Sequence, residues 1–385
     1  MNKNEKAALK KIDENIQKLN NKDFTIFFFV VDSKNMSNGT MQYEYQMAKT
    51  LVDIGYDVKM IYQNDNEYSE AELNELTQKG SAIDENRVFR GVGEWMGTEY
   101  MDIEHLNIAQ HEWKIGPSDF LFIPEVFSTL MRETFKHKVP CKRIVILHNY
   151  DHITEFIPYN DDWATYGMRD VLTTSKVQER LIKTTFPYVD TKILTPYIPD
   201  YFMESAKPKQ LVVNVVSKKP EDVTKIIKLF YWKYPLYRFV TFRDLRGYSK
   251  SEFAEKLKEG VVTIWVDRET PFGYSALEAM KCGSIVIGKV PDVIPEWMTE
   301  NDELIKSGIW TYDVNAIPQI LASVIGTWMQ NKVPTELYDS MREFTKHYSE
   351  DKWKENVSTT IDSYVQHRIE ELTSIKDNIT NKKED

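Results

Sequence analysis

Two kinds of hydrophobic pattern alternate along the chain. Short, continuous apolar runs such as Thr25–Val31 and Asp119–Pro124 are separated by longer segments in which apolar residues recur every three or four positions. A continuous run is typical of a strand buried on both faces, and the second pattern is typical of an amphipathic helix. Strands that alternate with helices form βαβ units with parallel strands. The sequence therefore predicts an α/β fold.

The alternation occurs in two sets, separated by a turn-rich break at Thr195–Pro199 and a Lys/Pro stretch at 207–209. The break predicts an N-terminal domain over 1–200 and a second domain over 201–350, followed by a C-terminal helix and frayed tail over 351–385. The strands expected in the first domain are 25–31, 57–62, 119–124, 143–147, 170–175 and 192–194. Those expected in the second are 211–216, 238–242, 261–266 and 284–288.

Helices are expected between these strands. Their predicted ranges are 1–22, about 125–137, 176–185, 220–233 and 251–258, with a further helix from Ser275. Within the first, Leu9, Ile12, Ile16 and Leu19 form an apolar stripe. That stripe is typical of a helix packed on a domain surface, and a weak membrane-surface anchor is the alternative.

Composition narrows the class of protein. The 385 residues contain 49 Lys and Arg against 59 Asp and Glu, a net charge of −10, which disfavours binding of nucleic acid by bulk charge without excluding a local basic groove. Two cysteines, Cys141 and Cys282, exclude a disulfide framework and a cysteine-based zinc site. No apolar run is long enough for an export signal or a membrane span. We expect a cytoplasmic protein, with peripheral membrane contact and oligomeric state left open.

The segment from Asp267 to Gly283 holds the most specific chemistry. It follows a buried strand and opens a helix, with Ser275 as the expected N-cap. A helix N-terminus offers free N–H groups and a positive dipole end, which together suit a diphosphate. Glu278, one turn into the helix, can accept the two hydroxyls of a ribose, and Glu269 in the entry loop can meet the hydroxyls of a sugar.

Residues Phe272–Gly283 (FGYSALEAMKCG), the strand at 284–288 and Pro295-Glu296 resemble the retaining nucleotide-sugar glycosyltransferases of family 4. The resemblance implies the GT-B fold, in which two Rossmann-like domains face a cleft and the C-terminal helices cross back to the N-terminal domain. It also implies that the N-terminal domain binds the acceptor and the C-terminal domain binds a nucleotide-diphospho-sugar. Transfer would then retain the anomeric configuration and need no metal or other cofactor.

The same resemblance suggests site residues. The first acidic position of the family motif falls on Thr270, and Glu269 lies one residue earlier, so either side chain could serve there. Phe272, Gly273 and Tyr274 would bring backbone N–H groups to the ligand. The further residues expected to contact substrates are His148 and Gly39 in the first domain and Ser275, Glu278, Lys218, Lys219, Arg243 and Arg268 in the second. We assign His148, Glu269, Lys219 and Arg243 to catalysis and the others to substrate binding.

Donor and acceptor are less well defined than the reaction. The resemblance favours a UDP-sugar as donor, while the acceptor could be a glycan, a lipid-linked sugar or another hydroxyl compound, with nucleic acid disfavoured but not excluded. Two other functions stay open. A nucleotide-sugar epimerase would use the same fold, but would need an acid/base pair around the sugar. A non-catalytic binding subunit would fit the threonine at position 270.

Overall fold

The structure is a computed structural model. It describes residues 3–31, 39–63, 71, 74, 82–84, 87–89, 96–108, 114–135, 139–217, 220–267, 270, 272–300 and 303–381. The chain forms two compact units. Unit 1 comprises residues 1–173, 178–194 and 354–385, and unit 2 comprises residues 174–177 and 195–353. Residues 354–385 thus belong to unit 1. This agrees with the expectation that the C-terminal helices cross back to the N-terminal domain.

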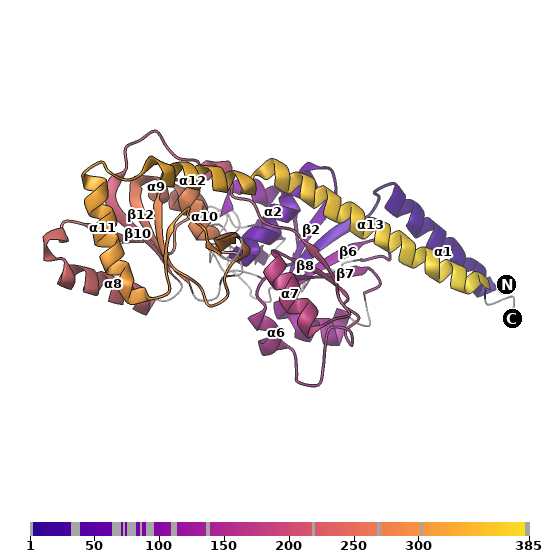
Figure 1. Cartoon of the computed structure of the whole chain (residues 1–385). Coiled ribbons are helices and arrows are strands. Elements are labelled where there is room, and N and C mark those ends of the chain that lie inside the picture. The colour runs from indigo at the N-terminus through magenta and orange to yellow at the C-terminus, as the bar shows by residue number, and fades with distance from the viewer. Residues whose placement is uncertain are drawn as a thin grey trace. The chain divides into compact units, whose positions relative to one another are not determined.

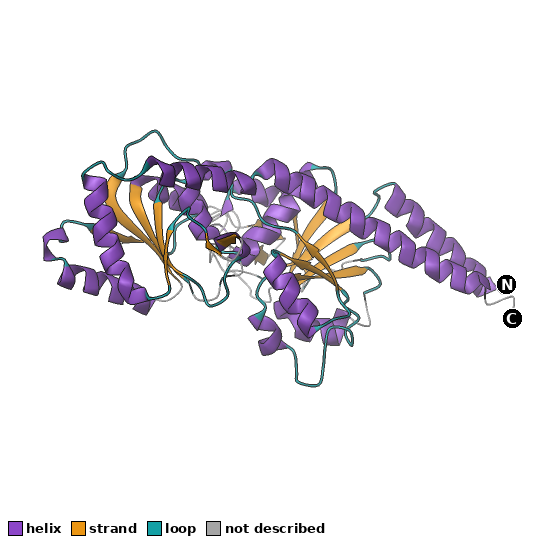
Figure 2. Ribbon diagram, in the orientation of Figure 1, coloured by secondary structure: helices purple, strands orange, loops and turns teal. Residues whose placement is uncertain are grey.

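Unit 1 is built on a seven-stranded sheet in the order β5-β2-β1-β6-β7-β8-β9, and every pairing in it is parallel. Parallel neighbours need crossover connections, which here run through helices and loops (Figures 1 and 2). The strands are β1 (Thr25–Phe29), β2 (Asp57–Tyr62), β5 (Glu104–Asn107), β6 (Phe120–Pro124), β7 (Lys142–Leu147), β8 (Asp170–Thr173) and β9 (Asp190–Ile193). A short antiparallel pair, β3 (Ala82–Asp84) and β4 (Arg87–Phe89), lies outside this sheet.

The helices of unit 1 differ from the prediction mainly after β6. The predicted helix over 125–137 is broken into a 3-10 turn, a short α4 (Ser128–Leu130) and a π-helical turn (Met131–Phe135). The other helices are α1 (Lys3–Asn20), α2 (Gly39–Asp53), α6 (Asp151–Phe156), α7 (Lys176–Thr185) and α13 (Glu350–Asn381). Helix α13 extends to Asn381. No helix among the described residues is both long and apolar enough to span a membrane.

Unit 2 contains a five-stranded parallel sheet in the order β11-β10-β12-β13-β16. Its strands are β10 (Gln210–Ser217), β11 (Thr241–Asp244), β12 (Gly260–Val266), β13 (Ile285–Lys289) and β16 (Ile309–Thr311), and β14 (Thr299–Glu300) pairs with β15 (Glu303–Leu304). Its helices are α8 (Pro220–Lys233), α9 (Lys250–Glu259), α10 (Tyr274–Lys281), α11 (Ile317–Met329) and α12 (Thr335–Thr345). Strand β11 begins later than predicted because the 3-10 turn at 235–237 continues as a turn at 238–239.

Central strands such as β6 and β12 are buried along their whole length, which explains their continuous apolar sequence. Helices lie on both faces of each sheet (Figure 2). In such sheets, ligands bind beyond the carboxyl ends of the strands. The fold therefore directs attention to the residues that directly follow β6, β7 and β12.

Candidate functional site

In unit 1, buried polar side chains gather at the carboxyl ends of three adjacent strands. Glu125 directly follows β6 and His148 directly follows β7, while Glu44 lies on α2, the helix that follows β1. Strands β1, β6 and β7 are neighbours in the sheet, so these three residues reach the same edge. Each of the three side chains is buried. The fold thus collects residues that are far apart in the sequence.

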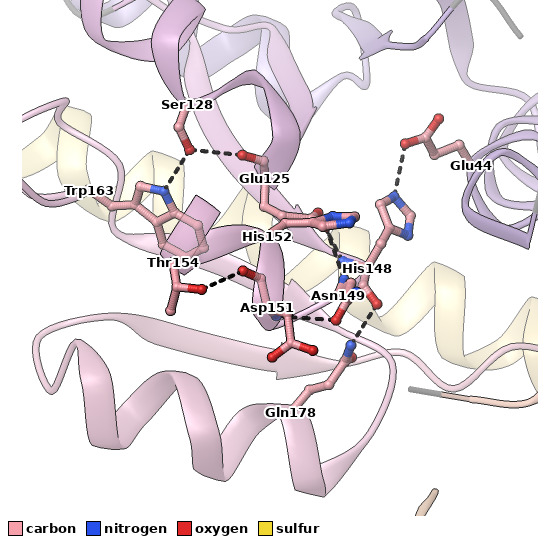
Figure 3. A network of polar contacts seen from close by, with 10 residues as sticks. All are labelled: Glu44, Glu125, Ser128, His148, Asn149, Asp151, His152, Thr154, Trp163 and Gln178. Carbon is pink, nitrogen blue, oxygen red and sulfur yellow. Dashed lines mark hydrogen bonds and ion pairs between the residues drawn. The ribbon is translucent and has the colours of Figure 1, made fainter. Parts of the chain in front are cut away.

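Glu125 holds the loop that begins at His148 (Figure 3). Its Oε2 accepts a hydrogen bond from the backbone N–H of His148 at 3.0 Å, and its Oε1 accepts one from the N–H of Asn149 at 2.9 Å. Oε1 also lies 2.8 Å from Nδ1 of His152, at the start of α6. This hydrogen bond raises the pKa of His152 above its usual value. A fully buried carboxylate thereby satisfies two backbone donors and one ring nitrogen.

His148 is fixed from both ends. Its Nε2 lies 2.9 Å from Oε1 of Glu44, and its carbonyl accepts a hydrogen bond from Nε2 of Gln178 at 2.8 Å. Burial raises the pKa of Glu44, an effect that the hydrogen bond to His148 partly opposes. An ionised Glu44 would accept a hydrogen bond from the Nε2–H of His148 and leave Nδ1 as an acceptor, whereas a protonated Glu44 would donate to Nε2 and leave the proton on Nδ1. Glu44 therefore decides which hydrogen bond the imidazole can offer a ligand.

In unit 2, the sequence motif opens α10 directly after β12. Gly273 is the N-cap of α10 and has φ 75° and ψ 44°, a left-handed conformation that favours glycine. A Cβ there would lie 3.1 Å from the ring of Trp297 and 3.3 Å from that of Trp265. The Trp297 indole N–H donates to the carbonyl of Phe272 and so holds the residue before the glycine in place. The first N–H groups of α10 are thus presented at the carboxyl end of the sheet.

Glu278 lies one turn into α10, as predicted, but in a more enclosed place than a ribose-binding carboxylate needs. Its side chain is fully buried, and its Oε1 is 2.9 Å from Nζ of Lys250 at the start of α9. Lys250 also lies over the ring of Phe253, with Nζ 5.5 Å from the ring centre. A ligand that reaches Glu278 must therefore rearrange this ion pair.

The other motif residues have varied positions. The hydroxyl of Thr270 donates to the carboxylate of Asp267, so an acidic group lies beside the first acidic position of the motif. Tyr274 and Ser275 are the first two residues of α10. The prediction that Ser275 is the N-cap is wrong, because the left-handed Gly273 ends the loop two residues earlier. The predicted residues Lys218, Lys219, Arg268 and Glu269 lie outside the described residues.

Two predicted residues sit at element boundaries. Gly39 is the first residue of α2, which places it at the same edge of unit 1 as His148. Arg243 lies on β11 and pairs with Glu259 at 2.8 Å. Glu259 directly precedes β12, so the Arg243 charge is directed toward the amino ends of the strands. The structure does not bring Arg243 together with the residues of the α10 turn.

Sequence reasoning missed Glu44, Glu125 and Lys250 and gave His152 no assigned role. Glu125 had a usable signal, since it is the acid that directly follows a buried strand. Lys250 follows Ser249, which forms a capping box with Glu252, so the start of α9 could have been read from the sequence. Glu44 gave no signal, because it lies within a helix whose two flanking tyrosines suggest ordinary packing.

A third polar group lies at the opposite edge of the unit 1 sheet. Among the described residues, Asp170, His367 and Glu371 are close enough together to hold a metal ion. However, Nζ of Lys142 lies 2.6 Å from Asp170 and 2.5 Å from Glu371, and Arg368 also pairs with Glu371 at 2.8 Å, so these two cations already balance the two carboxylates. Lys142 and Asp170 are the first residues of β7 and β8, and Glu371 is on α13. This group fastens α13 to the sheet and is separate from the His148 edge.

Comparison with known proteins adds independent information. No family model matches the chain. The chain is 25% identical over 222 residues to an alpha-1,6-glucosyltransferase from Actinobacillus pleuropneumoniae. The matched region covers 51% of this chain and 63% of that protein. The match therefore spans less than two thirds of the length of that relative.

Two solved structures match a larger share of the chain than this sequence relative does. A pneumococcal O-GlcNAc transferase, GtfA, in complex with UDP and GlcNAc has a TM-score of 0.59 at 11% identity and covers 89% of this chain and 99% of its own. A TarM variant from S. aureus, in complex with Fondaparinux, alpha-GlcNAc-glycerol and UDP, has a TM-score of 0.55 at 10% identity. The match covers 91% of this chain and 99% of the TarM chain. With its two parallel α/β sheets, this chain has the fold of the GT-B glycosyltransferases.

Proposed function

We propose that this protein is a glycosyltransferase that moves a sugar from a nucleotide-diphospho-sugar, a UDP-sugar in the first instance, to an acceptor hydroxyl. The main support is the α10 turn of unit 2, where a left-handed glycine after β12 presents helix N–H groups at the carboxyl end of a parallel sheet. Two structural neighbours are described as UDP complexes, and the sequence relative is described as a glucosyltransferase. These observations favour a donor site in unit 2.

The described residues suggest a division of chemical roles. The N–H groups and dipole of α10 would stabilise the negative charge of the departing diphosphate, together with nearby cations and without a metal ion. Asp267, held beside Thr270, would supply the acidic group that the motif lacks at position 270. In unit 1, His148 would offer a hydrogen bond to a sugar, with its orientation set by Glu44 and Glu125. The acceptor would be a glycan, a lipid-linked sugar or another hydroxyl compound.

We further propose that transfer retains the anomeric configuration. A same-face route through an oxocarbenium-like state would let the departing phosphate take the acceptor proton, so no separate general base is needed. The anomeric proton coupling of the glycoside product, measured by NMR, distinguishes retention from inversion. Activity that persists in excess EDTA would support metal independence, and activity restored only by Mg²⁺ or Mn²⁺ would contradict it.

Donor binding is the first property to test. UDP should raise the melting temperature of the full chain by mass action, and Glu278→Gln should reduce that shift. Glu343→Gln is the matched control, since it removes an exposed carboxylate of unit 2 that pairs with Lys346. If no nucleoside diphosphate or nucleotide-sugar in a panel shifts the melting temperature, the proposal is wrong. Tight binding without turnover across donors and acceptors would instead support a non-catalytic subunit.

A further inference from the structure

A cluster of exposed apolar side chains lies where α8 of unit 2 ends. Trp232 is 72% exposed, Leu236 is 87% exposed and Phe239 is 56% exposed. Backbone hydrogen bonds from Tyr234 to Phe230, from Tyr237 to Tyr234 and from Val240 to Tyr237 fold this segment into consecutive tight turns. Single exposed apolar residues are common on protein surfaces, but three large ones within eight residues of a compact turn require an explanation.

The domain core does not need these side chains. Phe230, Tyr234 and Tyr237, which alternate with the exposed residues, pack against the core of unit 2. The ring centres of Phe230 and Tyr237 are 5.9 Å apart, and Gly326 of α11 lies against the Tyr237 hydroxyl. The turn is therefore anchored on its inner face, and its outer face is free to serve another purpose.

The same segment is basic in an otherwise acidic protein. The chain has a net charge of −10, yet no Asp or Glu occurs between Val223 and Arg243. Lys228, Lys233 and Arg238 are exposed and form no ion pair within the part of the chain that the structure describes. Lys228 and Trp232 are four positions apart on α8 and so share one face of the helix (Figure 1 labels α8).

We propose that this surface, residues 228–239, docks on an anionic lipid membrane. Tryptophan favours the boundary between headgroups and acyl chains, and leucine and phenylalanine favour the acyl region just below it. Lysine and arginine beside them attract the negative surface potential of an anionic leaflet. A second copy of the chain fits less well, because a stable protein interface uses roughly 20–30 residues a side.

This surface differs from the one that the sequence suggested. The amphipathic helix α1 was the alternative membrane anchor, but its Leu19 is buried and its other apolar positions are half-buried. Asp13 on α1 pairs with Lys376 on α13 at 2.6 Å, and the two helices lie side by side in unit 1 (Figure 1). The apolar stripe of α1 is thus partly used within the protein, whereas the turn after α8 is not.

Vesicle co-sedimentation of the full chain tests the proposal. We expect binding to vesicles of mixed phosphatidylglycerol and phosphatidylcholine that is roughly tenfold stronger than binding to phosphatidylcholine alone, and that weakens as salt rises. The variant Trp232→Ser/Leu236→Ser/Phe239→Ser and the variant Lys233→Glu/Arg238→Glu should each lose this binding. Both should keep the wild-type melting temperature, because the changed side chains are exposed.

Tyr312→Ser is the matched control, since Tyr312 is 70% exposed in the same unit but lies outside the surface. It should bind the vesicles as the wild type does. Binding that is equal in all variants, or absent from the wild type, would overturn the proposal. So would light scattering that shows a wild-type dimer and a monomeric triple-serine variant, because the surface would then join two copies of the chain. None of these outcomes depends on sugar transfer, so they leave the proposed function untouched.

Discussion

The carboxyl ends of the two sheets hold buried carboxylates that interact with different kinds of partner. In unit 1, Glu125 accepts hydrogen bonds from two backbone N–H groups and faces one imidazole. In unit 2, Glu278 faces the ammonium group of Lys250. The first arrangement fixes the shape of a loop, and the second is a buried ion pair that a ligand could exchange. The comparison suggests that unit 1 is built for positioning and unit 2 for binding.

The largest effect should come from removing the carboxylate that holds the unit 1 loop. Glu125→Ala would leave the N–H groups of His148 and Asn149 and the ring of His152 without their acceptor. An unsatisfied buried donor costs about 1–3 kcal/mol, and the two half-buried donors and the cavity left by the shorter side chain add to this, so we expect a loss of about 5 kcal/mol in the free energy of unfolding. Urea denaturation followed by circular dichroism measures this loss. A change of about 1 kcal/mol or less would show that the loop does not depend on Glu125.

Glu125→Gln separates charge from shape in the same experiment. In the wild type, the pKa of His152 is raised above 6.5, so the protonated form stabilises the folded state. That contribution is fully present below pH 6.5 and is lost as the pH rises through the higher folded-state pKa. The glutamine variant should lose this pH dependence and keep part of the backbone hydrogen bonding. An unchanged His152 titration, followed by NMR, would contradict the assignment.

A smaller loss is expected when the ion pair of unit 2 is broken. Lys250→Met leaves the carboxylate of Glu278 buried without its counter-charge, which typically costs about 3–5 kcal/mol. The double variant Lys250→Met/Glu278→Met should recover most of that loss, because an apolar pair can replace a buried ion pair at little cost. The free energies of unfolding of the four proteins in this cycle provide the measurement. Additive effects of the two substitutions would show that the pair is not coupled.

The smallest effect concerns a lysine of unit 2 whose ammonium group donates to a backbone carbonyl. Lys209 donates to the carbonyl of Cys282 at 2.6 Å, and burial lowers its pKa from 10.5 to about 8. The folded state then binds fewer protons than the unfolded state between about pH 8 and 10.5, so stability rises with pH in this window. At pH 7, Lys209→Met should be about 1–2 kcal/mol more stable than the wild type, after the lost hydrogen bond is counted.

The pH dependence provides the check on Lys209. The stability advantage of Lys209→Met should shrink as the pH rises from 8 toward 10, because the wild-type lysine then loses its proton in the folded state while most unfolded chains still hold it. Lys207→Met changes a neighbouring exposed lysine and should show no such trend. Parallel curves for wild type and Lys209→Met would mean that Lys209 titrates normally.

The sequence was most informative where structure is local. Helices α7 and α8 have the bounds that periodicity predicted, because each is an amphipathic segment bounded by strands and turns. The α10 turn could be recognised because its glycine, its helix start and Glu278 lie within a few residues of one another. The prediction of one continuous helix after β6 is wrong, since a 3-10 turn and a π-helical turn interrupt it. The Ser128 hydroxyl donates to the carbonyl of Glu125 in this segment.

The sequence by itself determined the α/β class, the strand and helix alternation and the position of the glycine turn, because these follow from hydrophobic periodicity and backbone preference. Only the tertiary structure decided which carboxylates meet which bases. Glu44 and His148 are 104 positions apart, and Glu278 and Lys250 are 28 apart. Strand order and the need to balance buried charge determine which side chains become partners. The hydrophobic pattern of neighbouring residues contains neither kind of information.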